Sequence, residues 1–439
     1  MANIHYRMKT LGFLLLFLLA SPITLFITLV TLFIHVITRK PAVSNPHAKR
    51  ILISNAGMTK ALQMARSLHS DGHYVVLTEE YPLATHRYSR CVSKFHLCAD
   101  SDDRPAYIQS IADIVRRERI DLYVPVSHSS TERVDARIRE VLLQFNCETF
   151  HGTVEQLDML SDKCAFIDQA RSFGLTVPKS YRITDRQQVL DFDFSKEKHE
   201  FILKSIAYDN ISRSNLRKLP CHTRQETINY VSSLPIGKDS PWILQEFIPG
   251  KEYCTHGAVR NGELRLYCCC ESSSWLLQYK HMNNKPLILE WVREFCARIN
   301  LTGQASFDFI ESTEDGRPYA IECNPRTHTA ITAFYNQPLV AQAYLDKEPL
   351  TSGPIQPLST ARETYWLYHE LWSLFRVRCF QDWLRHFNRL FHGKEAIYSV
   401  DDPLPFLLHY TVHMPYLLLF NLLYPRQYNK VDCALGLIL

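Results

Sequence analysis

The sequence predicts a protein of mixed α/β and α+β class with several domains, and three features indicate this. Its 439 residues, 46% hydrophobic and 21% charged, suffice for about three domains with ordinary apolar cores. Apolar strands alternate with helices over residues 50–127, which is typical of a parallel sheet. Farther along, turn signals at Asn261-Gly262 and Asp315-Gly316 indicate antiparallel hairpins.

We expect four parts along the chain: a membrane anchor at 1–40, an α/β domain at 41–150, a larger mixed domain at 151–350 and a helical region at 351–439. Residues 11–37 contain no Asp, Glu, Lys or Arg, and this run exceeds the roughly 20 apolar residues that cross a bilayer. Basic residues are denser after the run, so we expect a membrane-attached protein whose body faces the cytoplasm. Pro22 leaves a kinked or hairpin-like insertion open.

The composition excludes some partners and sites. A formal charge of +4 without a long Lys/Arg block gives a nucleic-acid partner no electrostatic support. The thirteen cysteines contain no C-x-x-C pair, so neither a zinc site nor a disulfide framework is indicated. We expect "CCC" at 268–270 to be a buried strand of free thiols, which suits a reducing compartment.

The first α/β unit begins with a strand, a turn, a helix and a second strand over residues 50–79, and a helix leads into a strand at 121–126. The turn "SNAGMTKA" has a single glycine, so a dinucleotide fingerprint is absent. The fold alone makes a small-molecule crevice at the strand ends plausible. The polar segments 86–90 and 127–130 fall at these ends and could contact a substrate, although loop polarity explains them equally well.

The larger mixed domain begins with two helices that end near Gly174 and Pro178. A strand at 200–207, a helix at 223–233 and a strand at 241–248 follow. A hairpin then turns at Asn261-Gly262, and a helix at 287–299 precedes the second hairpin.

That second hairpin ends in "AIECNPR", where Glu322, Asn324 and Arg326 occupy alternate positions. Alternate side chains of a strand share one face. Asp308 lies on the opposite arm of the hairpin. Carboxylate and amide oxygens suit Mg²⁺, which is usually shared with phosphate oxygens. A hairpin with solvated carboxylates explains these residues equally well.

Other candidate residues lie upstream. Lys163 is isolated in "SDKCAF", and Lys204 lies inside an apolar strand, where a nucleotide phosphate could supply its anion. The alternative is a lysine whose ammonium reaches solvent at a strand end. In "LQEFIPGKE", residues 245–248 could offer backbone groups to adenine, and Glu252 could bind ribose hydroxyls.

In this order, the residues resemble the series found in ATP-grasp ligases, over about residues 150–345. The resemblance implies ATP and Mg²⁺ as cofactors and makes residues 151–350 the nucleotide-binding and catalytic domain. The implied roles are phosphate binding by Lys163 and Lys204, adenine recognition by Gln245, Glu246, Phe247 and Ile248, ribose binding by Glu252, Mg²⁺ binding by Asp308, Glu322 and Asn324, and stabilisation of a phosphorylated intermediate by Arg326.

One segment departs from that family. ATP-grasp enzymes often close a glycine-rich loop over the phosphates, but residues 205–219 contain no glycine. Arg213 or Arg217 could substitute for the backbone groups of such a loop.

Stretches such as "GMTKALQMARS", "FILKSIAYD" and "AIECNPRTHTAITAFYNQP" are further similar to mycosporine-glycine synthases, a branch of these ligases. That resemblance implies ligation of glycine to the cyclohexenone 4-deoxygadusol through a phosphorylated enol. His328 would accept the amine proton, or would merely be hydrogen-bonded near the strand end. Ligation of another amino acid to a different acid or enol remains open, as does a membrane-tethered ATP sensor without turnover.

Residues 362–424 are rich in aromatic residues and Leu. They predict a helical layer packed on the ligase core. The alternative is an interfacial patch that lies on the bilayer beside the N-terminal segment.

Overall fold

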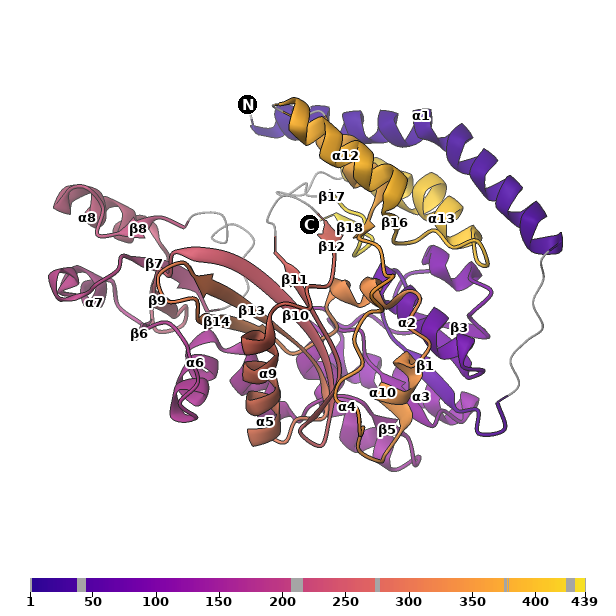
Figure 1. The fold of residues 1–439 in the computed structure, drawn as a ribbon, viewed down its shortest axis with the longest axis horizontal. Helices are drawn as coiled ribbons and strands as arrows, with labels where there is room; N and C mark the ends of the chain where they lie inside the picture. Colours follow the sequence, from indigo (N-terminus) through magenta and orange to yellow (C-terminus); the bar gives the residue numbers. More distant parts are fainter. Residues whose placement is uncertain are drawn as a thin grey trace.

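The chain folds around three larger sheets, and the first and third of them share one hydrophobic core (Figure 1). The computed structural model describes residues 2–37, 45–206, 216–272, 277–374, 377, 379–423 and 431–438. Within these residues, the larger sheets have five, four and four strands, and two smaller sheets have three and two. The mixed α/β content predicted from the sequence is therefore confirmed.

The five-stranded sheet is parallel and has the strand order β3-β2-β1-β4-β5. Its strands are β1 (Arg50–Ile53), β2 (Tyr74–Glu79), β3 (Lys94–Leu97), β4 (Leu122–Val124) and β5 (Glu148–Thr149), and its helices are α2 (Thr59–Ser70), α3 (Arg104–Glu118) and α4 (Glu132–Leu143). Ile51 and Ile53 enter one core, whereas Leu52 enters another on the opposite face. Because both faces are covered, the strands read as continuous apolar runs.

A second sheet forms a small antiparallel lobe with the order β6-β9-β7-β8. Its strands are β6 (Ser180–Ile183), β7 (Phe201–Ser205), β8 (Lys218–Leu219) and β9 (Trp242–Glu246), with α7 (Arg186–Leu190) and α8 (Arg224–Ser233) beside them. Phe201, Leu203 and Leu244 face the core of this lobe. Since side chains alternate along a strand, Lys204 and Gln245 face the other way.

The third sheet is antiparallel and has the order β11-β10-β13-β14. It consists of β10 (Gly250–Arg260), β11 (Glu263–Glu271), β13 (Gly303–Ser312) and β14 (Pro318–Asn324), with α5 (Val154–Ser161), α6 (Lys163–Ser172) and α9 (Pro286–Arg298) on one face. Asn261 and Gly262 both have positive φ, 50° and 77°, as a two-residue hairpin turn requires. Residues 268–270 are fully buried on β11, as predicted.

The C-terminal region is a helical layer with short strands, as predicted for residues 362–424. Three elements precede this region: β12 (Gln278–Tyr279), the 3-10 helix η4 (Thr329–Phe334) and α10 (Val340–Leu345). The region itself consists of β15 (Thr364–Tyr365), α11 (Leu367–Ser373), α12 (Phe380–His392), β16 (Lys394–Glu395), α13 (Leu404–Leu408), the π-helix η6 (His409–His413), α14 (Met414–Leu423), β17 (Val431–Asp432) and β18 (Leu437–Ile438).

The N-terminal helix α1 (Ala2–Ile37) packs against this layer. It continues through Pro22 as one helix, so it does not form a hairpin. The ring of Phe17 stacks on Tyr368 at 4.3 Å between centroids, and Phe13 stacks on Trp372 at 4.0 Å. Among the described residues, two helices, Arg7–His35 and Leu404–Leu423, are long and apolar enough to cross a membrane. Membrane attachment itself stays a prediction.

The hairpin of β17 and β18 covers part of the strand-end crevice predicted for the first sheet. The N–H of Thr59, at the start of α2, donates to the carbonyl of Ala434 at 2.9 Å. A Cβ on Gly436 would lie 2.6 Å from the carbonyl oxygen of Gly57, so only glycine allows this close approach. The β1–α2 turn therefore meets protein where an open crevice was expected.

Lys60 links the first sheet to the segment that follows β14. Its ammonium is buried and donates to the carbonyls of Thr327 at 2.8 Å and Ser127 at 3.4 Å. Burial, reinforced by the nearby Arg326 guanidinium, lowers the pKa of Lys60 to about 7. The contact between the first sheet and the segment after β14 thus contains a lysine amine, that of Lys60, whose pKa is near neutrality.

Replacing Lys60 by Met should change how stability depends on pH. Between its folded pKa of about 7 and the ordinary value of 10.5, the unfolded chain binds more protons than the native chain. The contribution of Lys60 to stability therefore rises with pH across this window. We expect the free energy of unfolding of the wild type, relative to Lys60→Met, to rise by up to about 1.4 kcal/mol per pH unit in urea titrations. Exposed Lys347→Met is the control, and parallel curves for Lys60→Met would refute the expectation.

Candidate nucleotide-binding site

The hairpin of β13 and β14 places Asp308 directly opposite Glu322. Both carboxylates are partly exposed, whereas Phe307 and Phe309, on either side of Asp308, are fully buried. The buried phenylalanines fix which face the carboxylates share. Like charges directly opposite each other on paired strands are destabilising, so this position favours cations nearby.

Two lysines from separate elements supply positive charge at this position. Lys163 is the first residue of α6, and its Nζ lies 3.8 Å from Oε2 of Glu322. Lys204 lies on β7 of the small lobe and donates to Oε1 of Gln245 at 2.9 Å. Burial lowers the pKa of Lys204, while the Glu322 carboxylate acts in the opposite direction. Both lysines and both acids predicted from the sequence thus lie around one site.

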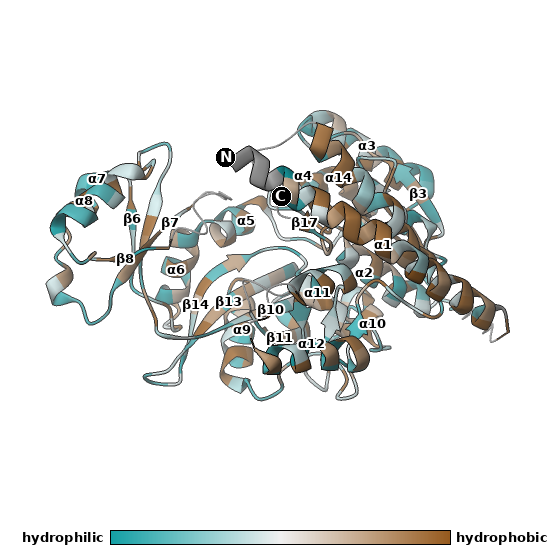
Figure 2. Cartoon of the chain, turned by 90° about the horizontal axis from the view of Figure 1, so that it is seen from above, coloured by the Kyte–Doolittle hydropathy of each residue, from teal (hydrophilic) through white to brown (hydrophobic). Residues whose placement is uncertain are grey.

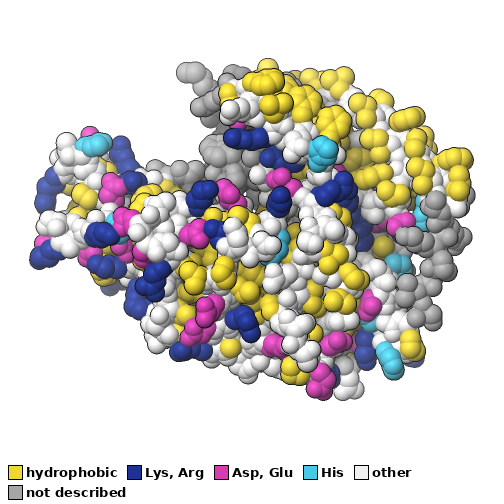
Figure 3. All heavy atoms as spheres, in the orientation of Figure 1, with side chains coloured by type: hydrophobic (Ala, Val, Ile, Leu, Met, Phe, Trp, Pro, Cys, Tyr) yellow, Lys and Arg dark blue, Asp and Glu magenta, His cyan; other side chains and the backbone are white. Residues whose placement is uncertain are grey.

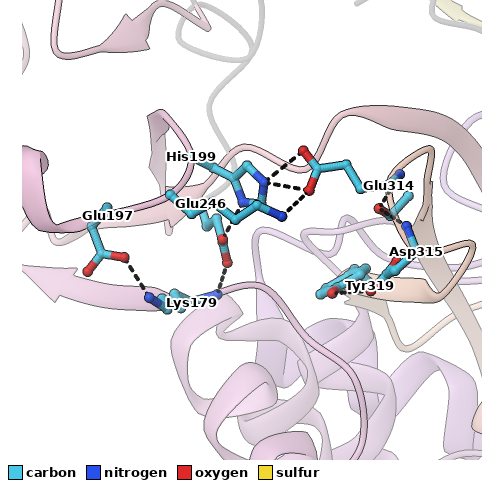
Figure 4. Close-up of polar contacts among 9 residues, drawn as sticks. Lys179, Glu197, His199, Glu246, Glu314, Asp315 and Tyr319 are labelled. Atoms are coloured by element: carbon cyan, nitrogen blue, oxygen red, sulfur yellow. Dashed lines mark hydrogen bonds and ion pairs between the residues drawn. The ribbon is translucent and has the colours of Figure 1, made fainter.

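The segment predicted to recognise adenine joins the small lobe to β10. Its Glu246 accepts from the N–H of Lys179 at 3.0 Å and contacts Nδ1 of His199 at 2.7 Å (Figure 4). The N–H of Phe247 donates to the carbonyl of Glu200 at 2.8 Å.

The next residue, Ile248, differs from Phe247 in its backbone hydrogen bonding. Within the described part of the chain its backbone N–H donates to no protein acceptor. Its side chain is buried, which holds the backbone in place. A fixed, uncommitted N–H beside an apolar side chain is suited to the edge of a purine base.

His199 connects this segment to the turn between β13 and β14. On its other side, Nε2 lies 3.0 Å from both carboxylate oxygens of Glu314 (Figure 4). The hydrogen bond with Glu246 is the main cause that raises the pKa of His199, and Glu314 acts in the same direction. One imidazole thus bridges carboxylates of the small lobe and the large sheet.

Glu252, predicted to bind ribose, lies at the exposed start of β10. Its Oε1 accepts the hydroxyl of Ser272 at 2.9 Å. The carboxylate is therefore accessible from solvent and already oriented by one donor.

Arg326 has a different set of contacts from the one expected. Its guanidinium donates to Oε2 of Glu132 at 2.7 Å and to Oδ1 of Asn324 at 2.6 Å. The amide nitrogen of Asn324 in turn lies 3.5 Å from Oδ2 of Asp308. Arg326 therefore ties the end of β14 to α4 of the first domain. The predicted role of Arg326 at an intermediate stays a prediction.

The donor set of this site fits magnesium. Among the described residues, no group of three or more His, Cys, Asp or Glu side chains is arranged to hold a metal ion. Asp308 and Glu322 provide two carboxylates, and Asn324 would add its amide oxygen by releasing Arg326. Magnesium is commonly bound by one or two carboxylates together with water and substrate phosphates, so a larger protein cage is unnecessary.

His328 caps the short helix η4 by accepting the N–H of Ala330 at Nδ1, 3.2 Å away. Burial, together with the positive charges of Lys60 and Arg326, lowers its pKa to about 3. The ring is therefore neutral, and the cap leaves its hydrogen on Nε2. In this state Nε2 of His328 is a hydrogen-bond donor. The ring is hydrogen-bonded near the strand end, which is one of the two alternatives that the sequence left open, and its role as a proton acceptor stays a prediction.

Several neighbours of this segment were not expected from the sequence. Lys60, Glu132 and His256 lie around residues 326–328, and His128 belongs to the weakly indicated segment 127–130. Nδ1 of His256 accepts the N–H of His328 at 3.4 Å, and its Nε2 has no hydrogen-bond partner among the described residues. A sequence signal existed for Lys60 and His128, since both lie in the segments that follow the parallel strands β1 and β4, whose ends meet at one edge of the sheet.

The glycine-free loop is only partly described. Residues 207–215, which include Arg213, lie outside the described residues. The guanidinium of Arg217 lies over the ring of Tyr230, 5.9 Å from its centroid. Arg217 therefore contacts the small lobe.

Comparisons with known proteins agree with this arrangement. Residues 160–330 match the family model of the ATP-grasp domain. The fold is similar to an N5-carboxyaminoimidazole ribonucleotide synthetase in complex with ADP, at 13% identity and a TM-score of 0.53, with 74% of this chain and 82% of that chain covered. A comparison with curated protein sequences gave no match.

Two further solved structures share the fold. One is the Campylobacter jejuni biotin carboxylase in a β-γ-ATP complex, at 14% identity and a TM-score of 0.53, covering 69% of this chain and 72% of that one. The other is the Staphylococcus aureus N5-carboxyaminoimidazole synthetase with ADP, at 15% identity and a TM-score of 0.50, covering 67% and 75%. The nucleotides in these structures agree with the ATP expected from the sequence.

Replacing His199 by Gln should destabilise the protein mainly at low pH. The pKa of His199 is raised in the folded state, so its contribution to stability is present below the ordinary histidine value and is lost as pH rises through the raised one. We expect the melting temperature of His199→Gln to fall below that of the wild type at about pH 6 and to approach it at about pH 9. Exposed His47→Gln should show no such trend. A deficit that is equal at both pH values would mean that the charge of His199 is unimportant.

Replacing Lys204 should weaken ATP binding. We expect Lys204→Met to raise the Kd for ATP at least about tenfold in calorimetric titrations, because a charge-assisted hydrogen bond to phosphate is lost. Since burial lowers the pKa of Lys204, wild-type affinity should decline at alkaline pH sooner than that of Lys204→Arg, whose side chain stays protonated. Exposed Lys238→Met serves as the control. Unchanged affinity in Lys204→Met would remove Lys204 from the phosphate site.

Proposed function

We propose that this chain is an ATP-dependent carbon–nitrogen ligase that activates an oxygen of its acceptor by phosphorylation. The observation that carries the proposal is the convergence of Lys163 and Lys204 on the paired carboxylates Asp308 and Glu322. Two cations and two anions, each on a different element, suit a nucleotide polyphosphate with its metal ion. A hairpin with merely solvated carboxylates would not bring in two lysines.

Each part of the site has a role in this proposal. The N–H of Ile248 would bind adenine, Glu252 the ribose hydroxyls, and Lys163 and Lys204 the phosphates. Magnesium held by Asp308 and Glu322 would neutralise charge on the phosphoryl group during transfer. Phosphoryl transfer depends chiefly on positioning and electrostatics, which these fixed side chains supply.

The acceptor would lie beside the end of β14, next to residues 326–328. Arg326 and Lys60 bring positive charge there, and His328 and His256 are neutral because burial lowers the pKa of each to about 3. Nε2 of His256 and Oγ1 of Thr327 are buried without hydrogen-bond partners in the described structure. Buried donors without partners beside positive charge favour an anionic ligand, such as an enolate or a carboxylate.

For the substrates we propose glycine and 4-deoxygadusol, on the strength of the sequence stretches similar to mycosporine-glycine synthases. The enol oxygen would attack the γ-phosphorus of ATP, and ADP would leave. The glycine nitrogen would then add to the carbon that carries the phosphate. The C–O bond to phosphate would break, and the nitrogen would lose a proton. Another amino acid with a different acid or enol acceptor would use the same residues.

An ADP-release assay tests the proposal. The full chain, given ATP, magnesium, glycine and 4-deoxygadusol, should release one ADP for each glycine adduct found by mass spectrometry. ADP release only with a different acceptor would support the assignment as a ligase and exclude glycine and 4-deoxygadusol as its substrates. ATP binding without ADP release for any acceptor would favour an ATP sensor.

The carboxylates provide a matched test of the site. We expect Asp308→Asn and Glu322→Gln each to lower kcat at least about a hundredfold, since each removes charge that holds the metal. Glu294→Gln, an exposed carboxylate paired with Arg298, should keep full activity. Full activity in both site variants would show that the hairpin carboxylates take no part in the reaction.

A further inference from the structure

Helix α12 is amphipathic, but its apolar face points to solvent and its polar face points to the protein. Its apolar residues recur at the helical spacing, at Phe380, Trp383, Leu384, Phe387 and Phe391, and all five face solvent. Phe380 is 74% exposed and Phe391 75%. A helix on the surface of a soluble domain normally turns such a stripe toward the core.

The inward face of α12 is polar. Arg389 is buried and donates to Oε1 of Glu370 at 2.5 Å and to Oε1 of Glu363 at 3.3 Å. His386 is buried beside it and contacts Glu370 as well. These hydrogen-bonded charges fix the rotation of the helix about its axis, because turning the stripe inward would bury aromatics only by breaking all three contacts. The outward stripe is therefore built into the fold.

Helix α1 has a similar outward face. Phe13 and Phe17 are buried against the body. On the other side Leu19 is 77% exposed, and Phe26 and Phe33 are each 68% exposed. The described structure has no charged side chain between residues 11 and 35 of this helix. An apolar strip thus runs along nearly the whole length of α1.

The exposed faces lie on one side of the molecule. Figure 1 shows α1 and α12 along the upper side of the molecule, and Figure 2 shows α14 next to α1, with which it is in contact. Helix α11 connects α1 to α12, since Trp372 of α11 stacks on Phe13 of α1 and Glu370 of α11 pairs with Arg389 of α12. Hydrophobic side chains gather over α12 and α1 in Figure 3. On α14, Phe420 and Leu423 are exposed as well.

We infer that the outward faces of α1, α12 and α14 form one lipid-facing platform that rests on a single leaflet of a bilayer, with α1 in the membrane plane. The α12 stripe and the α1 strip are themselves apolar, and lipid tails need none of the hydrogen-bonding groups that a protein partner would use for recognition. Exposed Arg7 on α1 and Arg385 beside the α12 stripe supply cations at its edge for lipid phosphates.

The packing of α1 distinguishes resting on the membrane from crossing it. Besides Phe13 and Phe17 near one end, Thr31 exchanges a hydrogen bond with the hydroxyl of Tyr398 at 2.7 Å near the other. A helix that crossed the bilayer would have to leave these contacts over most of its length. In-plane binding keeps them all and places the apolar strip in the acyl region.

Vesicle flotation of the full chain tests the platform. We expect the wild type to float with phosphatidylcholine–phosphatidylglycerol vesicles, and the triple variant Phe380→Ser, Phe387→Ser, Phe391→Ser to bind at least about tenfold more weakly. The matched control is Leu97→Ser, Leu143→Ser, Leu287→Ser, which alters three exposed leucines on other elements and should float like the wild type. An unchanged melting temperature and ADP release would show that both variants fold.

Two outcomes would overturn the inference. Equal flotation of the α12 triple variant and the wild type would show that α12 does not face lipid. Failure of the wild type to float, with an oligomer that the α12 variant converts to monomer, would assign the surface to a second copy of this chain.

A tag placed before Met1 tests the orientation of α1. In sealed vesicles that carry the body on the outside, external protease should remove the tag together with the body. A tag that stays protected until detergent opens the vesicles would show that α1 crosses the bilayer, and the in-plane arrangement would then be wrong.

Discussion

The opposition of Asp308 and Glu322 is the constraint on which the site depends. The ladder hydrogen bonds between β13 and β14 set these residues in register, and the buried Phe307 and Phe309 prevent the strand from turning its carboxylates elsewhere. The two charges cannot separate, so cations have to come from other parts of the chain. Lys163 is delivered by α6 on the large sheet, and Lys204 by the small lobe. Lys163 and Lys204 thus bring the large sheet and the small lobe together around the paired carboxylates.

Much of the fold could be predicted because it depends on local signals. The apolar run of β1, the Asn261-Gly262 turn and the helix that ends before Gly174 each follow from neighbouring residues, and the structure has them where they were expected. The site residues on one hairpin share a face by strand alternation alone. The approach of Lys163 and Lys204 was inferred from family resemblance, since no local rule brings residues of two different sheets and their helices to one place.

What could not be predicted rests on contacts between distant segments. The guanidinium of Arg326 is hydrogen-bonded to Glu132, a residue almost two hundred positions away, and no spacing rule reveals that pair. The cap that His328 provides for η4 sets its tautomer, which is a property of backbone geometry. The outward stripe of α12 is a third case. Its period is plain in the sequence, but the buried Arg389 that decides which way the stripe faces depends on Glu370 and Glu363 of other elements.

The hydrogen bond between Thr59 and Ala434 has a consequence for how the chain is made. A ribosome releases the strands of the first sheet long before residues 431–438 exist. Until residues 431–438 have been made, the start of α2 lacks the carbonyl that it meets in the folded molecule. The first sheet is thus closed by residues that are synthesised much later, and a chain that stops before them leaves the β1–α2 turn uncovered.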